Sequence, residues 1–350
     1  MYILTHTIVN PKLSEQEQFV KLHQQKPEAL IEWAARLCYN SQGKFGTHSE
    51  FIPGLIKSGH MDVLEHVSLS AKIKFHDLEP EARYYWYYIT KNQYPYLDIK
   101  IRDNSAIMST NMRVWQEMYW RDFAALDAFS VEDKIQFWYY LNYICPHVIG
   151  KPKEYQFEIS RMGGEHEIER QCAATYNKVR NTIKNFAKNH VMLTTDAEAD
   201  VTLLGYSGFF KEDNIFYATV QYDGVSRAFM AQHTRHRLLS HSVTSQRYVD
   251  QSNSYPVITG KVDLATRHII EDDYRRTMKL YESLREKNKK EDARMILPNC
   301  TNTSMVSSSN HAGWLHYLKL RTAKDAQHEI RQCALATETL LNQIIGGVHE

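Results

Sequence analysis

The sequence has no apolar run long enough to cross a bilayer, and no signal-peptide pattern follows Met1. Its formal net charge is only +1, whereas general nucleic-acid-binding proteins are strongly basic. It is also poor in cysteine, with 5 residues that form no CxxC pair, which argues against a disulfide framework and against a zinc site. We therefore expect a cytoplasmic protein with reduced thiols, no bound metal, and neither a membrane nor nucleic acid as partner.

Acidic residues are absent between Asp223 and Asp250, although this stretch is rich in arginine. It contains an Arg-His-Arg triplet at 235–237 and, after seven further residues, a Ser-Gln-Arg-Tyr run at 245–248. Guanidinium groups bind phosphate oxygens in a bidentate manner, and hydroxyl donors often complete such anion sites. The pattern predicts a site for a small anion. From residue types alone, an arginine-rich loop paired with distant carboxylates, or a nucleic-acid patch, stays open as the alternative.

The spacing of this stretch resembles the signature of the flavin-dependent thymidylate synthases, which is Arg-His-Arg, seven residues and then Ser. Other segments resemble further blocks of that family in the same order. They are LIEWAARLCYNS at 30–41, GHMDVLEH at 59–66 (GHxSxxEH in the family), ARMILPN at 293–299, LR at 320–321 and QHEIR at 327–331. The resemblance covers residues 28–75 and 200–340.

Local patterns predict an α/β protein. Apolar and polar residues alternate at 67–75 and at 215–222, as in half-buried strands, and the second run ends at an expected turn at 223–224. Helical patterns cover 226–239, 263–290 and 310–341. The resemblance implies a flavin-dependent thymidylate synthase-like fold, with a small, mostly antiparallel sheet and long helices.

Residues 76–199 separate the two similar regions. We expect 1–75 and 200–350 to form the catalytic domain, and 76–199 to be an inserted or degenerate-repeat helical segment that is rich in aromatic residues. Its aromatic runs at 84–88 and 137–140 are expected in a core or at a subunit interface.

Two short echoes raise the possibility of a repeat. The string STNMRVW at 109–115 resembles an NxRxW element that the family carries near its C-terminus, and EHEIERQC at 165–172 is similar to QHEIRQC at 327–333. The spacing between the echoes differs in the two halves. A degenerate repeat and an ordinary inserted subdomain therefore both stay open.

The resemblance implies roles for individual residues. The expected dUMP contacts are Gln232, Arg235, Ser245, Arg247, Arg294 and Arg321, of which Arg321 and Ser245 are the candidate catalytic residues. The expected FAD contacts are His60, Arg235, His236, Arg237, Asn310 and His316. Without the family, Arg294 would be read as an i,i+3 partner of Glu291, Arg321 as an exposed charge, and His60 as a capping or core histidine.

The implied reaction is the reductive methylation of dUMP to dTMP. Methylene-tetrahydrofolate supplies the carbon, NADPH reduces FAD, and no cysteine nucleophile is needed. The family assembles as a homotetramer whose active sites combine residues from several subunits. The additional segment of this chain makes a dimer a second option.

Asp62 stands where the family usually has a serine, and three further positions depart from the family pattern. Ala312, Asp325 and Val243 stand where the family usually has an arginine, a histidine and a polar residue, and Arg113 is a candidate to replace the missing arginine. These departures keep two alternatives open. One is a related flavin and folate enzyme that methylates or hydroxymethylates another pyrimidine nucleotide (dUMP or dCMP), and the other is a non-catalytic nucleotide-binding homologue.

Overall fold

The chain is built from two structural units, each assembled from several separate stretches of sequence. The computed structural model describes residues 2–10, 12–13, 18, 22, 26–75, 79–120, 130–152, 154–183, 191–195, 198–208 and 215–345. Unit 1 comprises residues 1–32, 46–186 and 205–218, and unit 2 comprises residues 33–45, 187–204 and 219–350. This grouping differs from the expected pairing of 1–75 with 200–350, which stays a prediction about the catalytic domain.

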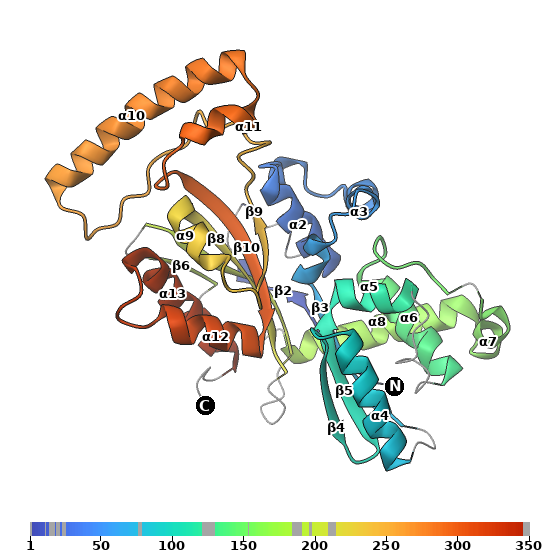
Figure 1. Cartoon of the computed structure of the whole chain (residues 1–350). Helices are drawn as coiled ribbons and strands as arrows, with labels where there is room; N and C mark the ends of the chain where they lie inside the picture. Colours follow the sequence, from blue (N-terminus) through green and yellow to red (C-terminus); the bar gives the residue numbers. More distant parts are fainter. Residues whose placement is uncertain are drawn as a thin grey trace. The chain divides into compact units, whose positions relative to one another are not determined.

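Unit 1 contains an antiparallel sheet with the strand order β1-β3-β5-β4 (Figure 1). The strands are β1 (Tyr2–His6), β3 (Ser68–Lys74), β4 (Asp98–Arg102) and β5 (Ser105–Asn111). The strand expected at 67–75 is therefore confirmed as β3. A short strand, β2 (Ile8–Val9), pairs with the end of β7 (Asp200–Ser207) at Tyr206 and Gly205.

Unit 1 also contains several helices. They are α2 (Glu28–Cys38), whose last turns belong to unit 2, α3 (His48–Lys57), α4 (Pro80–Gln93), α5 (Met112–Trp120), α6 (Val131–Ile144), α7 (Gln156–Arg161) and α8 (Gly164–Ile183), with the 3₁₀ helices η3 (Gln42–Lys44) and η4 (Asp62–His66). Pro80 at the first position of α4 and the Ser130 cap of α6 mark helix starts that the sequence favours.

The aromatic residues of α5 and α6 form the core of unit 1. The ring of Trp115 meets that of Phe137 edge-on at 4.8 Å, and Trp138 meets Tyr119 at 4.9 Å. The expectation of a core is confirmed for the run at 137–140, whose side chains are all buried. On α4, by contrast, Tyr84 is 69% exposed.

Unit 2 contains a second sheet, in which β7, β8, β10 and β9 follow one another and β6 pairs with β7. The strands are β6 (Met192–Thr194), β8 (Tyr217–Ser226), β9 (Ser240–Val243) and β10 (Asn302–Asn310). The helices are α9 (Arg227–His233), α10 (Leu264–Lys287), α11 (Lys290–Ala293), α12 (His311–Arg321) and α13 (His328–Ile345), with the 3₁₀ helix η6 (Arg294–Ile296). Figure 1 shows α9, α12 and α13 beside β8 and β10, with α10 and α11 at one end of this sheet.

The coarse prediction of an α/β fold with antiparallel sheets is confirmed, with corrections. The described part of 76–199 holds strands β4, β5 and β6 as well as helices, so a purely helical segment is the wrong description. The expected turn at 223–224 lies inside β8, where Gly224 has a positive φ of 69°. The helix expected at 310–341 is two helices, because the chain turns at 322–327.

The structure bears on membrane-spanning helices and on disulfide bonds. Among the described residues, no helix combines the length and the apolar character needed to cross a membrane. No disulfide joins any of the five cysteines, all of which lie in the described part of the chain.

Candidate functional site

Helix α9 carries one predicted site residue, Gln232, and a buried carboxylate fixes the start of the helix. The Ser226 hydroxyl caps the helix by accepting a hydrogen bond from the Phe229 backbone N at 2.9 Å. Glu329 in α13 accepts hydrogen bonds from the backbone N and the hydroxyl of Ser226, both at 2.6 Å. Burial raises the pKa of Glu329, because the carboxylate has lost most of its water. Serine favours the position before a helix, but no local pattern identifies a partner 103 positions away.

The Arg-His-Arg triplet lies in a loop, residues 234–239, which we call the RHR loop. Its middle residue turns inward: His236 is 4% exposed, and its backbone N donates to the His233 carbonyl at 3.1 Å. Its outer residues, Arg235 and Arg237, are exposed. No ion pair joins either of these arginines to a carboxylate within the described ranges. The loop therefore presents two uncompensated guanidinium groups on either side of a buried imidazole.

The buried imidazole holds Arg321, the last residue of α12. The Arg321 Nε donates to His236 Nε2 at 2.7 Å, and Arg321 Nη2 lies 3.5 Å from the Gln232 carbonyl oxygen. The ring of Tyr317 packs edge-on against His236 at 5.0 Å. Burial, followed by the charge of Arg321, lowers the pKa of His236 to about 4. His236 is thus a neutral acceptor near pH 7. We call Gln232, Arg235, His236 and Arg321 the His236 cluster.

A second group of basic residues lies around Thr244 and Ser245, and we call Arg227, Ser245, Arg247 and Arg294 the Arg294 cluster. The Arg227 Nη1 donates to the Thr244 carbonyl at 3.4 Å. Burial, and after it the positive charge of Arg294, lowers the pKa of Arg227. Two positive charges that influence each other in this way are unfavourable unless an anion balances them. The sequence patterns did not identify Arg227 as a site residue. Its position directly after Ser226, at the start of the helix that carries Gln232, could have indicated it.

The remaining member of that cluster has a carboxylate partner. The Arg247 Nε donates to Glu291 at 2.5 Å, and the Arg247 backbone N donates to the Ser245 hydroxyl at 3.2 Å. Part of the positive charge between Asp223 and Asp250 is therefore balanced by a carboxylate outside that segment, since Glu291 follows Arg247 by 44 positions. Glu291 thus forms an ion pair with Arg247, whereas the i,i+3 pattern alone would have paired it with Arg294.

The other expected flavin contacts fall in different places. The Asn310 side chain accepts a hydrogen bond from the Gly313 backbone N at 3.0 Å and so caps α12. His316 is exposed, with its ring 5.9 Å from that of His236. His60 belongs to unit 1, where it is exposed between α3 and η4.

The three further departures from the family pattern have simple surroundings. Val243 faces Met305 across the β9–β10 pair, so an apolar partner is present for its side chain. Ala312 is exposed in the first turn of α12, and Asp325 is exposed in the turn before α13. None of the three leaves a buried polar group of its own without a partner.

The two clusters lie at opposite ends of one short helix. Arg227 is the first residue of α9 and Gln232 is its last but one, which separates them by about 7.5 Å along the helix axis. The Arg294 cluster gathers charged donors that suit a dianion such as a phosphate. The His236 cluster holds the Arg321 guanidinium in a fixed orientation, in which it can stabilise negative charge on a bound ligand. The six predicted dUMP contacts thus fall into two groups.

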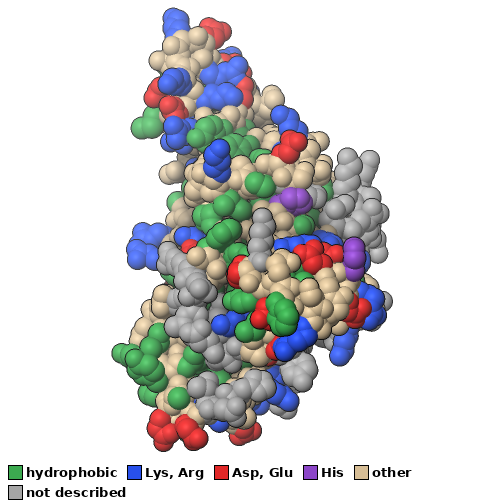
Figure 2. Space-filling model, turned by 90° about the vertical axis from the view of Figure 1, so that its right-hand side faces the viewer, with side chains coloured by type: hydrophobic (Ala, Val, Ile, Leu, Met, Phe, Trp, Pro, Cys, Tyr) green, Lys and Arg blue, Asp and Glu red, His purple; other side chains and the backbone are tan. Residues whose placement is uncertain are grey.

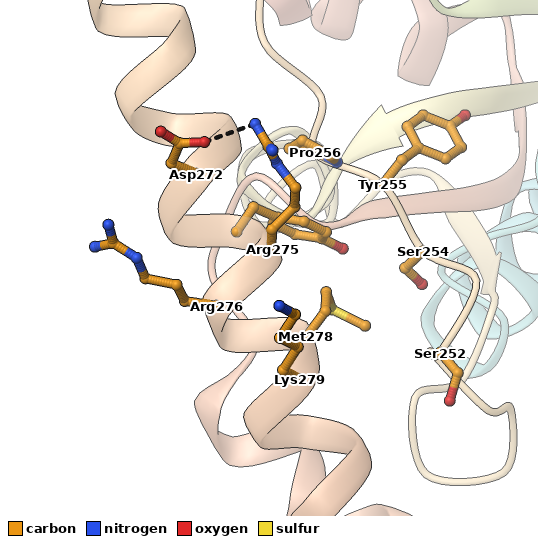
Figure 3. A pocket seen from close by; sticks show the side chains of 10 residues that line it. Ser252, Ser254, Tyr255, Pro256, Asp272, Arg275, Arg276, Met278 and Lys279 are labelled. Atoms are coloured by element: carbon orange, nitrogen blue, oxygen red, sulfur yellow. Dashed lines mark ion pairs between the residues drawn. The ribbon is translucent and has the colours of Figure 1, made fainter.

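A separate groove lies elsewhere in unit 2. It has a volume of about 530 Å³ between α10 and residues 252–256, and Figure 3 shows Arg276 pointing away from that loop. Its Arg275 pairs with Asp272 at 2.6 Å. None of the predicted site residues lines this groove.

Two further observations concern the surface charge and the potential metal ligands of the described residues. On the face in Figure 2, basic side chains lie among acidic ones rather than forming one continuous basic surface. Within the described residues, no group of three or more His, Cys, Asp or Glu side chains is arranged to hold a metal ion.

Comparison with known proteins bears on this arrangement. The family model described as thymidylate synthase complementing protein matches residues 20–77 and 214–345. Similar curated proteins include the flavin-dependent thymidylate synthase of Mycobacterium tuberculosis strain H37Rv, which is 31% identical over 138 residues, 34% of this chain and 54% of that protein. The corresponding enzyme of Geobacter sulfurreducens is 36% identical over 131 residues, 36% of this chain and 55% of that protein.

A phage protein is similar over a longer stretch. The probable flavin-dependent thymidylate synthase of Mycobacterium phage L5 is 32% identical over 163 residues, 42% of this chain and 65% of that protein. The chain thus spans between about half and two thirds of the length of these relatives. The two matched segments of the family model cover more than half of the chain and contain both clusters. The chain therefore belongs to the thymidylate synthase complementing protein family.

Proposed function

We propose that this protein catalyses the reductive methylation of dUMP to dTMP, with methylene-tetrahydrofolate as carbon donor and NADPH-reduced FAD as reductant. Membership of the family and the names of its relatives support the proposal. The observation that carries it is the pair of basic clusters at the two ends of α9. One end suits a phosphate and the other holds a single oriented guanidinium.

The Arg294 cluster is the proposed phosphate site. Arg227 and Arg294 are half-buried like charges, and a phosphate dianion would relieve their repulsion. Ser245 and Arg247 add a hydroxyl and a second fork of donors. Arg321 is proposed to lie against the pyrimidine, where its orientation by neutral His236 stabilises negative charge that develops on the ring.

The residues of the RHR loop fit a flavin dinucleotide. Exposed Arg235 and Arg237 offer guanidinium donors for a pyrophosphate. Nδ1 of buried His236 has no hydrogen-bond partner among the described residues, so a ligand atom can satisfy it. When bound, FAD supplies the redox chemistry, and the protein supplies binding and orientation. The proposed contacts also include His60, Asn310 and His316.

A cysteine nucleophile has no support in the structure. Cys300 is the cysteine near Arg294 in sequence, and it packs beside the apolar cluster of Tyr274, Met278 and Tyr281. Burial raises the pKa of its thiol, which opposes formation of the reactive thiolate. The proposed reaction accordingly relies on the flavin rather than on covalent attack by sulfur.

We propose that the protein works as a cytoplasmic homo-oligomer, a tetramer or a dimer, without nucleic acid as partner. The predicted dUMP contacts fall into two clusters, which is the arrangement expected if one subunit completes the site of another. Mixing two variants that each lack one cluster tests this sharing.

We further propose that residues 68–183 are a degenerate second copy of the fold of unit 2. Two shared features of topology support this. Each unit contains three consecutive strands, β3, β4 and β5 in unit 1 and β8, β9 and β10 in unit 2, of which the third lies between the first two, in the orders β3-β5-β4 and β8-β10-β9. In both, that third strand ends in an asparagine that caps the next helix, with Asn111 accepting from Val114 at 3.1 Å and Asn310 from Gly313 at 3.0 Å.

Packing supports the same proposal. Four residues after each asparagine stands a tryptophan, and both Trp115 and Trp314 are 0% exposed. The echo at 165–172 lies in α8 and the echo at 327–333 runs into α13. The cysteine that ends each echo is buried, Cys172 at 2% and Cys333 at 0% exposure.

The proposed copy in unit 1 has no counterpart of the two basic clusters among its described residues. Arg113, two residues after the capping asparagine, is occupied by ion pairs with Glu65 at 2.7 Å and Glu117 at 3.1 Å. We therefore expect one nucleotide site per chain, in unit 2. Calorimetric titration with dUMP measures this directly, and a stoichiometry near two per chain would contradict it.

The experiment that tests the activity begins with visible absorption spectra of the purified protein with and without FAD and dUMP. We expect flavin bands that dUMP perturbs. Turnover with dUMP, methylene-tetrahydrofolate, NADPH and FAD should then add one methyl group, and the mass of the product identifies it. Incubation with dCMP serves as the control, because conversion of dCMP but not of dUMP would overturn the proposed substrate.

A further inference from the structure

One serine hydroxyl in β10 holds both ends of the RHR loop. The Ser307 Oγ lies 3.0 Å from His233 Nε2 and 3.0 Å from His241 Nδ1. His233 is the last residue of α9, directly before the loop, and His241 lies in β9, directly across from Ser307 in the β9–β10 pair. Both attachments of the loop therefore meet at a single atom.

We call Ser307, His233 and His241 the Ser307 hub, and its two hydrogen bonds depend on one another. A serine hydroxyl carries one proton, and a neutral imidazole carries one N–H. Because the hydroxyl has one proton and two lone pairs, Ser307 accepts from at least one of the two histidines, and it either donates to the other or accepts from it as well. Ser307 and His233 are both 0% exposed, so water cannot replace a lost partner. Removal of the hydroxyl leaves two imidazole nitrogens without a hydrogen bond.

A second serine on the same face of β10, Ser309, forms a hydrogen bond with a residue inside the loop. Side chains alternate along a strand, so residues 307 and 309 point to the same side. The Ser309 Oγ donates to the carbonyl of Leu238, inside the loop, at 2.8 Å. Ser308 points the other way, and its hydroxyl donates to Thr219 at 2.9 Å. The loop is thus attached to β10 at its start, near its end and just after it.

We propose that Ser307 is a positioning residue that holds the RHR loop with Arg235 and Arg237 facing outward, and that FAD affinity depends on this hold. The inference rests on the proposed function for its second half only. Its first half concerns the conformation of the loop, and it is measurable without any ligand. No flavin contact is assigned to Ser307 itself, because it acts through the loop.

The test compares Ser307→Ala with Ser308→Ala in the whole protein. The two serines are neighbours on β10, both are 0% exposed, and each variant removes one buried hydroxyl. Amide hydrogen exchange and the rate of trypsin cleavage after Arg235 and Arg237 report on the loop. Titration with FAD and, separately, with dUMP reports on the two clusters, and thermal unfolding reports on the fold.

We expect similar losses of thermal stability in the two variants. We expect Ser307→Ala alone to speed exchange and cleavage in the loop by about tenfold and to weaken FAD binding by a similar factor. Because Ser307→Ala can also impair folding, His241→Leu is a second variant, which removes one of the two bonds from the half-buried end of the hub. It should loosen the loop by a smaller factor.

Two results would overturn the proposal. One is equal exchange in the loop for Ser307→Ala, His241→Leu and Ser308→Ala. The other is a loosened loop with unchanged FAD affinity, which removes the link between the hold and the flavin. If the wild-type protein binds no FAD, the proposed function fails, and the exchange measurement still decides whether Ser307 holds the loop.

Discussion

Arg321 and His236 lie 85 positions apart in the chain, yet the Arg321 Nε donates a hydrogen bond to His236 Nε2 at 2.7 Å. Because burial and the charge of Arg321 keep the pKa of His236 near 4, the imidazole remains an acceptor at neutral pH. The guanidinium is thereby oriented before any substrate binds. An oriented cation stabilises developing negative charge at little cost in reorganisation.

Replacement of Arg321 tests its proposed catalytic role. We expect Arg321→Ala to lower kcat for dUMP methylation by about a hundredfold, as for the loss of one preorganised donor. Lys319, exposed in the last turn of the same helix, provides the control, and Lys319→Ala should keep its kcat. Steady-state kinetics of the two variants decide the matter, and an unchanged kcat in Arg321→Ala would place the charge stabilisation elsewhere.

Arg227 is expected to contribute to phosphate binding, since it is half-buried near Arg294. Arg227→Ala should weaken dUMP binding by about tenfold to a hundredfold, the range for a charged hydrogen bond. Binding of deoxyuridine, which lacks the phosphate, should not change. Titration calorimetry with both ligands makes the comparison, and Arg276→Ala, on the exposed side of α10, is the control. Equal losses for dUMP and deoxyuridine would contradict a phosphate role.

Elements set by local patterns could be predicted from the sequence. Alternation located β3, and helical periodicity located α10 with an error of a few residues. The Asn310 cap is also readable, because asparagine favours the position before a helix. In contrast, the strands β4 and β5 were missed, because runs as short as five and seven residues give too little periodicity to separate a strand from part of a helix.

The candidate site was predictable as residue types but not as geometry. The Arg-His-Arg spacing selected a segment that lies inside the family match. Which arginines are free and which are paired depends on contacts such as Arg247 with Glu291. Such contacts join distant parts of the chain, so no local pattern encodes them. For the same reason Glu329 and Ser307 could not be assigned to the site beforehand.

Sharing of the active site between subunits is testable by mixing two nearly inactive variants. We expect Arg294→Ala and Arg321→Ala alone each to keep only about a hundredth of the wild-type activity, since each lacks a key residue of one cluster. If the two clusters of one site come from different subunits, denaturation and joint refolding should restore about a quarter of the wild-type activity, because random dimers regain one intact site in half of the pairs. If both clusters serve a site within one chain, the mixture stays nearly inactive. Refolding each variant alone is the control.

The buried histidine His6 predicts how stability changes with pH. His6 is 0% exposed, its Nδ1 hydrogen-bonds to the Thr7 carbonyl at 2.8 Å, and burial lowers its pKa from 6.5 to about 4. Between these values the unfolded chain binds a proton that the folded chain does not. Stability is thus complete above pH 6.5 and falls as the pH is lowered to 4, by up to about 3 kcal/mol for this group.

Urea unfolding at several pH values between 7 and 4 measures this dependence. His236 and His241 also have pKa values lowered to about 4, so the wild-type slope includes their contributions. The variant His6→Gln keeps a donor for the Thr7 carbonyl but cannot titrate. We expect its stability to depend less steeply on pH, and identical slopes for the two proteins would refute the assignment to His6.

Gly313 offers a prediction about the junction between α12 and the RHR loop. A Cβ at this position would lie 2.0 Å from the Ser309 hydroxyl oxygen and 3.1 Å from the Leu238 carbonyl oxygen. Gly313→Ala should therefore break the hydrogen bond between Ser309 and Leu238 and lower the free energy of unfolding by about 2 kcal/mol. A Cβ added at Gly54, in α3, would meet no atom within 4 Å, so Gly54→Ala should instead stabilise by about 0.5–1 kcal/mol through helix propensity. Urea unfolding separates the two cases, and a Gly313→Ala protein as stable as the wild type would show that β10 and the loop are not tightly packed at this residue.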